Sequence, residues 1–390
     1  MFLLYSPACN PKSAFLYPRM PSCRSALTDR QLFLFFLYTW HTKTHQTNYF
    51  KGGINMDFPE YSPTIFYRLI QQHKEAQLLL AAIRLEVCSY LQKPSSASEI
   101  AQHTQCDPQN MDFFLTALSS IGLLKKEHNL FRNSPEAQLY LDKNSSLYLG
   151  EYFLFWEKKT SLEQVEELVR HGAAAPCQQD QGHAFYNFRE LARLSATEIL
   201  TGRVQSFLKS AQNIFPKSTP LHLLDLGGGS GRMALEFGKE HPQATGVIFE
   251  HPSVADIPAG HIAEEHLEDR FSIIQGDFTC DDIGCGYHLL IVSGVLDFGG
   301  DALDELVTKI SAAALSGAYL YLVSHDVSDD YTAPKEAIVG WLSSHLAGLR
   351  ILMPKSRIKA ALTAAGFQPL SINEQNGVIS RLQGEWYRRD

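Results

Sequence analysis

The sequence predicts an α/β chain in which a doubly wound sheet follows a mostly helical domain. A short apolar segment at 221–226 runs into the glycine-rich turn 227–231 and then into a helical pattern at 232–240. A strand, a glycine turn and a helix in this order form the ligand-binding crevice of doubly wound proteins. Three further strand-like segments follow: 246–250, 271–278 and 288–293. A pattern of three helices and a hairpin precedes them.

The composition is that of a folded, mildly acidic protein. Of 390 residues, 45% are hydrophobic and 19% are charged, so the chain can bury a substantial core. Its net charge of −8 is unlike that of proteins that coat nucleic acids. No apolar run approaches the roughly 18 residues of a membrane span. Seven cysteines fit a reducing compartment, so we expect a cytoplasmic protein that binds neither nucleic acid nor membranes.

The spacing of the cysteines and histidines predicts no metal site. Cys280 and Cys285 are further apart than the two cysteines of a zinc-binding pair, and no second pair lies nearby. The 15 histidines are scattered along the chain. We therefore expect Cys280 and Cys285 to be free thiols in a loop.

Residues 1–55 differ from the rest of the chain. They carry a net charge of +5 and 11 of the 43 aromatic residues, whereas residues 56–390 carry a net charge of −13. They show no amphipathic period, and their apolar run is too short to span a membrane. The segment Lys51-Gly-Gly, just before Met56, can be encoded by a ribosome-binding sequence. We expect translation to start at Met56 and 1–55 to be a misread leader, with a disordered tail as the alternative.

Residues 56–145 predict a small domain of three helices and a hairpin. Helices are expected at 65–91, after 98 and over 108–121, with strands at 123–126 and 130–132. Ser95 or Ser96 can cap the second helix. Asp107 can cap the third, and Pro108 suits its first turn. This order of elements is typical of a winged helix.

A winged helix often binds DNA, but the helix expected over 108–121 contains no Lys or Arg and carries Asp112. Because phosphate neutralisation needs basic side chains, packing or dimerisation is the favoured role. A winged-helix regulator that senses a ligand is an alternative.

Residues 146–215 are expected to be a helical linker that contributes to a substrate pocket, with a break at 171–176. The aromatic segment 182–188 either covers that pocket or packs between helices. The remaining domain, 216–390, contains the glycine-rich turn.

The glycine-rich turn has the pattern acid-x-Gly-x-Gly-x-Gly. Asp225 stands near the end of the first strand, and Gly227, Gly229 and Gly231 follow. Glycines allow the backbone to approach a ligand closely. A dinucleotide fingerprint that starts at Gly227 would require a glycine at position 232, which is Arg232. The pattern therefore disfavours a nicotinamide cofactor.

The next strands also end in polar or aromatic residues. Glu250 can accept hydrogen bonds from both hydroxyls of a ribose. Asp277 can accept from an adenine amino group, and Phe278 can pack on the ring. Ser293 ends the fourth strand. One such acid is usually a turn residue or a helix cap, but three around a glycine turn indicate a nucleoside site.

This constellation resembles that of the class I S-adenosylmethionine-dependent methyltransferases, which have a Rossmann-like domain. Further motifs are similar to those of the small-molecule O-methyltransferases of the caffeate and acetylserotonin type: AIRLEVCSYL at 82–91, ASEIA at 97–101, LSSIGLL at 118–124 and AALTAAGF at 360–367. The resemblance implies a homodimer formed by the first domain and S-adenosylmethionine bound by the second. It implies a small-molecule acceptor, expected to be a hydroxyl, with a thiol or an amine as alternatives.

The catalytic position departs from that family. The resemblance places a general-base histidine after the fourth strand, where this sequence has Asp297. It places an assisting acid after the next strand, where His325 and Asp326 stand. Asp297 is a candidate base, although the pKa of an unperturbed aspartate, about 3.9, makes it a weak one. Its alternative role is to cap a helix that begins near Asp301.

Two further possibilities remain open from the sequence. His345 lies on a helix expected to face the substrate and is a second candidate base. Alternatively, a thiolate or an amine of low pKa needs no strong base, because alignment can supply much of the acceleration. Loss of the family histidine also admits a non-methylating enzyme on the same fold, namely a hydroxylase, a decarboxylase or a rearrangement catalyst.

Overall fold

The computed structural model describes residues 61–175, 185–349, 351–371 and 384–390. The segment 1–55, expected as a misread leader or tail, lies outside these ranges, as do residues 182–184 of the aromatic segment. From Thr64 to Asp390 the chain forms one compact unit, so the boundaries expected at 145 and 215 remain predictions. In the described ranges, no helix is both long and apolar enough to cross a membrane.

The first part of this unit contains three helices followed by a hairpin, as predicted. Its elements are α2 (Thr64–Arg84), η1 (Val87–Tyr90), β1 (Ser95–Ser96), α3 (Ala97–Thr104), α4 (Pro108–Ser120), β2 (Leu124–Glu127) and β3 (Leu130–Asn133). Ser96 caps α3 in a reciprocal capping box with Glu99. The Asp107 carboxylate caps α4 by accepting from the N–H of Asn110 at 2.8 Å. The strands pair in the order β1-β3-β2.

The prediction of one helix over 65–91 was wrong in its extent. The α2 helix ends at Arg84, and Glu86 adopts a left-handed conformation with φ 55°. A short 3₁₀ turn follows and buries Val87 and Leu91 in the same core as the helix. The apolar residues keep helical spacing on both sides of the end of α2, so their spacing alone could not show where the helix stops.

Six helical segments connect this part to the sheet. They are α5 (Pro135–Tyr140), α6 (Gly150–Lys159), α7 (Val165–His171), α8 (Phe188–Glu198), η2 (Ile199–Thr201) and α9 (Arg203–Ala211). The predicted break after residue 171 is confirmed, because α7 ends at His171 and Gly172 has a positive φ of 70°. The α6 and α8 helices carry aromatic side chains to the cavity described below.

The sheet has seven strands in the order β6-β5-β4-β7-β8-β10-β9. Its strands are β4 (Leu221–Leu226), β5 (Ala244–Glu250), β6 (Phe271–Gln275), β7 (Tyr287–Ser293), β8 (Ala314–Val323), β9 (Phe367–Leu370) and β10 (Gly384–Arg389). The first five strands in this order are parallel, and β10 runs antiparallel to both neighbours. Strand β4 pairs with β5 on one side and β7 on the other, which makes its carboxyl end the switch point where ligands bind.

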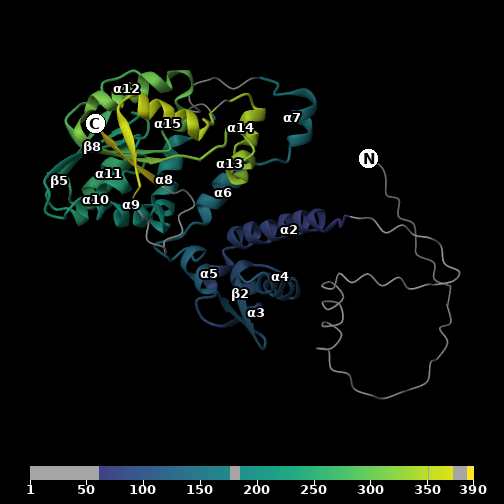
Figure 1. The fold of residues 1–390 in the computed structure, drawn as a ribbon. Coiled ribbons are helices and arrows are strands. Elements are labelled where there is room, and N and C mark those ends of the chain that lie inside the picture. The colour runs from purple at the N-terminus through teal and green to yellow at the C-terminus, as the bar shows by residue number, and fades with distance from the viewer. Residues whose placement is uncertain (1–60, 176–184, 350, 372–383) are drawn as a thin grey trace, which may run out of the picture. The chain divides into compact units, whose positions relative to one another are not determined.

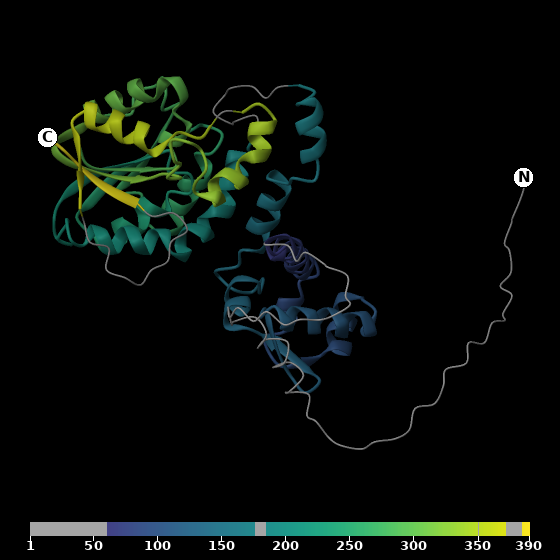
Figure 2. The same ribbon diagram turned by 45° about the vertical axis from the view of Figure 1, so that its right-hand side comes forward.

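Helices cover both faces of the sheet (Figures 1 and 2). The remaining ones are α10 (Arg232–Glu240), α11 (Asp256–Glu264), η3 (Leu296–Phe298), η4 (Gly300–Ala302), α12 (Leu303–Ala313), α13 (Lys335–Gly340), α14 (Leu342–Leu346) and α15 (Lys355–Ala364). The α9, α10 and α11 helices bury apolar side chains against one face. The α12 and α15 helices do so against the other. The predicted doubly wound α/β domain after a mostly helical one is confirmed.

Candidate active site

A cavity of about 600 Å³ opens at the carboxyl ends of the central strands. One part of its wall is the glycine-rich turn together with the residues that end β4, β5 and β7. The other part is aromatic and comes from helical segments outside the sheet: Tyr152, Trp156, Phe188, Phe298 and Trp341. The cavity therefore joins a polar half to an aromatic half.

The glycine-rich turn requires glycine for two separate reasons. Gly227, Gly229 and Gly231 have φ values of 61°, 58° and 71°, a region that favours glycine. A Cβ atom at Gly231 would lie 2.6 Å from the Ile248 side chain, so this glycine also permits close packing. At Gly229 a Cβ atom would have 4.0 Å to its nearest neighbour, so this residue faces open space. The turn thus exposes backbone to the cavity at Gly229.

Asp225 lies beneath this turn at the end of β4, with 2% of its surface exposed. Its Oδ2 atom has no hydrogen-bond partner among the described residues. Burial, reinforced by the nearby Glu250 carboxylate and opposed by a hydrogen bond from the Ala234 N–H, raises the pKa of Asp225 to about 7. A buried carboxylate of this kind favours a hydrogen-bond donor or a positive charge beside it.

We expect Asp225→Asn to change the pH dependence of the free energy of unfolding of the ligand-free protein. Because burial raises the Asp225 pKa above its unfolded value of about 3.9, the contribution of this residue to wild-type stability falls as the pH rises from 4 through 7. Asparagine at position 225 does not ionise, so the variant does not lose this part of its stability. Chemical denaturation should show the stability of Asp225→Asn relative to wild type rising by roughly 2–4 kcal/mol between pH 4.5 and pH 8.

The exposed Asp269→Asn controls for the loss of one charge and should show no such rise. An equal difference between Asp225→Asn and wild type at both pH values would contradict the burial effect.

Glu250 ends β5 and lies opposite the turn. Its carboxylate accepts from the N–H of Gly229 at 2.6 Å and from the N–H of His251 at 2.7 Å. Burial raises its pKa, and these two hydrogen bonds oppose that rise. A carboxylate can accept about four hydrogen bonds, so Glu250 retains capacity for a ligand's hydroxyl groups.

Three more predicted residues line the same cavity: Asp277, Phe278 and Ser293. The Asp277 carboxylate accepts from the N–H and the hydroxyl of Thr279, at 2.8 and 2.6 Å. Of the eight residues predicted to bind a cofactor, Gly231 alone is absent from the cavity wall. Gly231 is the N-cap residue of the α10 helix. The structure thus brings the other seven together.

The two predicted catalytic residues do not line the cavity. Asp297 is 2% exposed, and its Oδ1 accepts from the backbone N–H of His325 at 3.1 Å. Its Oδ2 lies 3.2 Å from Nδ1 of His325, within ion-pair distance but not aligned as a hydrogen bond. The alternative capping role was wrong, since α12 begins at Leu303 with Ala302 as its cap and no side-chain hydrogen bond.

His345 is half-buried on α14, where burial lowers its pKa. The residues of this region that line the cavity end at Trp341, and His345 lies one turn beyond it. The structure does not bring this histidine to the acceptor half.

The sequence placed His325 only at the position of an assisting acid and did not predict most of the aromatic wall. His325 lines the cavity and follows β8, so the same strand-end logic that found Glu250 could have placed it there. Trp156 and Trp341 carry no comparable signal, because each lies within a helical segment and not at the end of a strand. The aromatic segment 182–188 was predicted either to cover the pocket or to pack between helices. Of its described residues, Phe188 lines the cavity, whereas Tyr186 is buried and does not line it.

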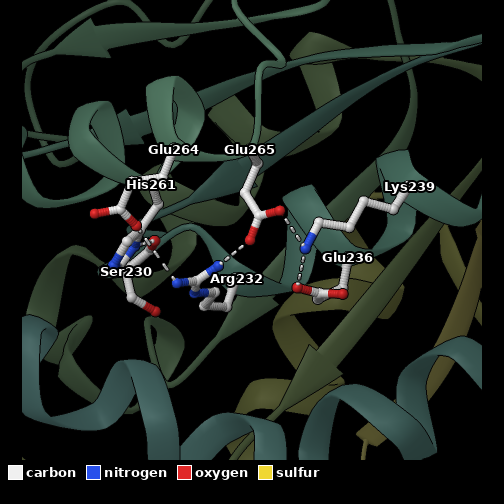
Figure 3. A network of polar contacts seen from close by, with 7 residues as sticks. All are labelled: Ser230, Arg232, Glu236, Lys239, His261, Glu264 and Glu265. Atoms are coloured by element: carbon white, nitrogen blue, oxygen red, sulfur yellow. Dashed lines mark hydrogen bonds and ion pairs between the residues drawn. The ribbon is translucent and has the colours of Figure 1, made fainter. Parts of the chain in front are cut away.

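Arg232, at the position where a dinucleotide fingerprint has a glycine, belongs to a polar network beside the turn (Figure 3). Arg232 pairs with Glu265 at 2.8 Å, and Lys239 pairs with the same carboxylate at 2.7 Å. On the other side, Nδ1 of His261 lies 2.8 Å from the carbonyl oxygen of Ser230. These contacts fasten the turn and α10 to the segment around α11.

The sequence matches two family models. The model described as the O-methyltransferase dimerisation domain matches residues 67–143, and the model described as the O-methyltransferase domain matches residues 193–367. Together they cover more than half of the chain.

Curated relatives agree with these matches. The tetracenomycin polyketide synthesis 8-O-methyl transferase TcmO of Streptomyces glaucescens is 26% identical over 69% of this chain and 80% of its own. The 3-hydroxy-5-methyl-1-naphthoate 3-O-methyltransferase of Streptomyces sahachiroi is 23% identical over 70% of this chain and 81% of its own.

Solved structures share the fold. Human N-acetylserotonin methyltransferase in complex with SAM matches 85% of this chain and 99% of its own with a TM-score of 0.65 and 19% identity. An O-methyltransferase family protein from Burkholderia thailandensis matches the same shares with a TM-score of 0.66 and 18% identity.

Proposed function

The chain belongs to the S-adenosylmethionine-dependent O-methyltransferase family, and on that premise we propose that it methylates a hydroxyl group of an aromatic small molecule. The observation that carries this proposal is the two-part cavity. Its polar half suits a nucleoside with a cationic tail, and its aromatic half suits a planar acceptor. The two halves are continuous, as a direct transfer between two bound molecules requires.

The residues of the polar half fit S-adenosylmethionine, which supplies an electrophilic methyl group on a positively charged sulfur. We assign the ribose hydroxyls to Glu250, whose carboxylate has free acceptor capacity. Asp277 and Phe278 are assigned to the adenine ring. The backbone at Gly229 is left for the methionine portion, with the orphaned Oδ2 of Asp225 beneath the turn.

The aromatic half supports a planar acceptor. The rings of Trp156 and Trp341 lie 6.3 Å apart at an interplanar angle of 76°, and those of Phe298 and Trp341 lie 5.8 Å apart at 77°. Such edge-to-face arrangements leave flat surfaces on which another ring can pack. The relatives support the same class, because they include a 3-O-methyltransferase of a naphthoate, an 8-O-methyl transferase of tetracenomycin polyketide synthesis and acetylserotonin O-methyltransferase.

We assign residues 56–145 to dimerisation, 146–215 to a linker that completes the pocket, and 216–390 to binding S-adenosylmethionine. A homodimer is supported by the dimerisation-domain match and by exposed apolar residues on α2. The α4 helix has no Lys or Arg, which supports a role without nucleic acid. The exposed free thiols of Cys280 and Cys285 support a cytoplasmic location.

A matched set of acceptors tests the proposed chemistry. The protein would be incubated with S-adenosylmethionine and 3-hydroxy-5-methyl-1-naphthoate, 1-naphthol, naphthalene-1-thiol or 1-naphthylamine. Release of S-adenosylhomocysteine would be measured by mass spectrometry. We expect turnover with the hydroxyl compounds, because the cavity contains a histidine that can remove their proton. Turnover with the thiol or the amine alone would contradict the assignment to hydroxyl groups.

A further inference from the structure

We propose that His325 is the general base of the reaction and that the buried Asp297 is its positioning residue. The proposal rests on the methyl transfer proposed above and specifies how the acceptor loses its proton. The family resemblance places the histidine after the fourth parallel strand and the acid after the next one. In this chain the positions are reversed, since the carboxylate follows β7 and the imidazole follows β8.

Two histidines of the described chain line the cavity, His251 and His325, and His325 is the one with a buried carboxylate beside its ring. Its side chain is 16% exposed. Its Nδ1 atom is buried, 3.2 Å from Oδ2 of Asp297. The ring of Trp341 meets the imidazole edge-on, with centroids 5.3 Å apart and an interplanar angle of 84°. The imidazole is therefore held from two sides, and Nε2 is the nitrogen left for the cavity.

Asp297 holds His325 by two separate contacts. Its Oδ1 accepts from the backbone N–H of His325, and its Oδ2 lies beside the ring nitrogen. With 1% of its side chain exposed, Asp297 is shielded from the acceptor, which excludes direct proton removal by this carboxylate. A carboxylate beside Nδ1 keeps the proton on that nitrogen and leaves a lone pair on Nε2.

The other charged groups near His325 have partners of their own. Asp326 pairs with Lys355 at 2.7 Å and accepts from the Ser324 hydroxyl at 3.1 Å. Glu336 reaches the same cavity from α13 and lies 3.6 Å from Lys335. In the part of the chain that the structure describes, Asp297 is the one carboxylate within 4.0 Å of a ring nitrogen of His325.

Nε2 of His325 takes the hydroxyl proton while the acceptor oxygen forms a bond to the methyl carbon. The bond between that carbon and sulfur breaks, its electron pair remains on sulfur, and the sulfonium becomes a neutral thioether. The positive charge passes to the imidazolium, which the Asp297 carboxylate stabilises until the proton leaves to solvent. General-base catalysis of this kind contributes about 10²- to 10⁴-fold.

Three variants of the full chain test the proposal with 3-hydroxy-5-methyl-1-naphthoate as the acceptor. His325→Gln should lower kcat by about 10²- to 10⁴-fold and lose the acid limb of the pH profile. His345→Gln, the matched control, should remain within threefold of wild type, because that residue is outside the cavity. The affinity for S-adenosylmethionine should be unchanged in both, which shows that each variant is folded. A kcat of His325→Gln within threefold of wild type would overturn the proposal.

A tautomer measurement tests the role of Asp297 and needs no acceptor. Correlation of ring protons with ring nitrogens by NMR should show the Nδ1–H tautomer at His325 in wild type, and a shift toward Nε2–H in Asp297→Asn. Asp297→Asn should also lower kcat with little change in KM. Nε2–H in wild type would overturn the proposal whatever the acceptor is. If wild type shows the Nδ1–H tautomer but turns over none of the hydroxyl acceptors, the proposed function is refuted and the arrangement of Asp297 and His325 is not.

Discussion

Gly229→Arg should abolish binding of S-adenosylmethionine, with a loss of affinity of more than about 1000-fold, or ~4 kcal/mol. The substituted residue would have open space around its Cβ atom, so the side chain would extend into the cavity rather than clash with the core. There it would bring a positive charge to the place assigned to a cationic cofactor. It would also displace the N–H of Gly229 from the Glu250 carboxylate.

The matched control is Gly122→Arg. Gly122 has a positive φ of 85°, is exposed, and has no atom within 4 Å of a Cβ position. Both variants therefore place a side chain at a positive φ and add the same charge, but only Gly229→Arg changes the cavity. Calorimetry with S-adenosylmethionine would compare them with wild type. Equal binding by Gly229→Arg and Gly122→Arg would rule out the assigned cofactor site.

Phe66→Asp combined with Ile70→Asp should convert a dimer into monomers. These residues lie one turn apart on α2 and are 67% and 61% exposed, beside the similarly exposed Ile65 and Leu69. An apolar stripe of this extent on a helix marks a contact surface. Two buried carboxylates without partners would cost several kcal/mol at an interface, which is enough to dissociate it. Light scattering should then report 43.7 kDa in place of twice that mass.

Arg68→Asp combined with Gln72→Asp is the control for that variant. It places two carboxylates at the same spacing on the same helix, at exposed positions that are already polar. The dimer should survive this change. Monomeric wild-type protein, or equal dissociation by both double variants, would contradict the assignment of the α2 stripe to the interface.

The sequence predicted most of the residues that line the polar half of the cavity because their signals are local. Three glycines with positive φ follow one strand, and Asp225 and Glu250 each end a strand that runs into a turn. Parallel strands bring such ends to one edge of the sheet, so residues that end these strands are expected to lie close together. The same reasoning predicted the caps of α3 and α4, which depend on residues three apart.

The roles proposed for Asp297 and His325 could not be predicted in the same way. Asp297 and His325 follow strands β7 and β8, which pair in parallel with Ser293 opposite Val323. Their neighbourhood was predictable, but their roles depend on depth: the carboxylate is buried and the imidazole reaches the cavity. The hydrophobic pattern of the sequence does not predict which of two adjacent loops is buried and which reaches the cavity. The position of Trp341 depends in the same way on packing between distant helices.

The fate of a labelled methyl group tests the central claim most directly. S-adenosylmethionine with a ¹³C-labelled methyl would be supplied with 3-hydroxy-5-methyl-1-naphthoate, and the product would be examined by NMR. We expect the label on the former hydroxyl oxygen, with one equivalent of S-adenosylhomocysteine. An acceptor that is hydroxylated, decarboxylated or rearranged without gaining the label would contradict it.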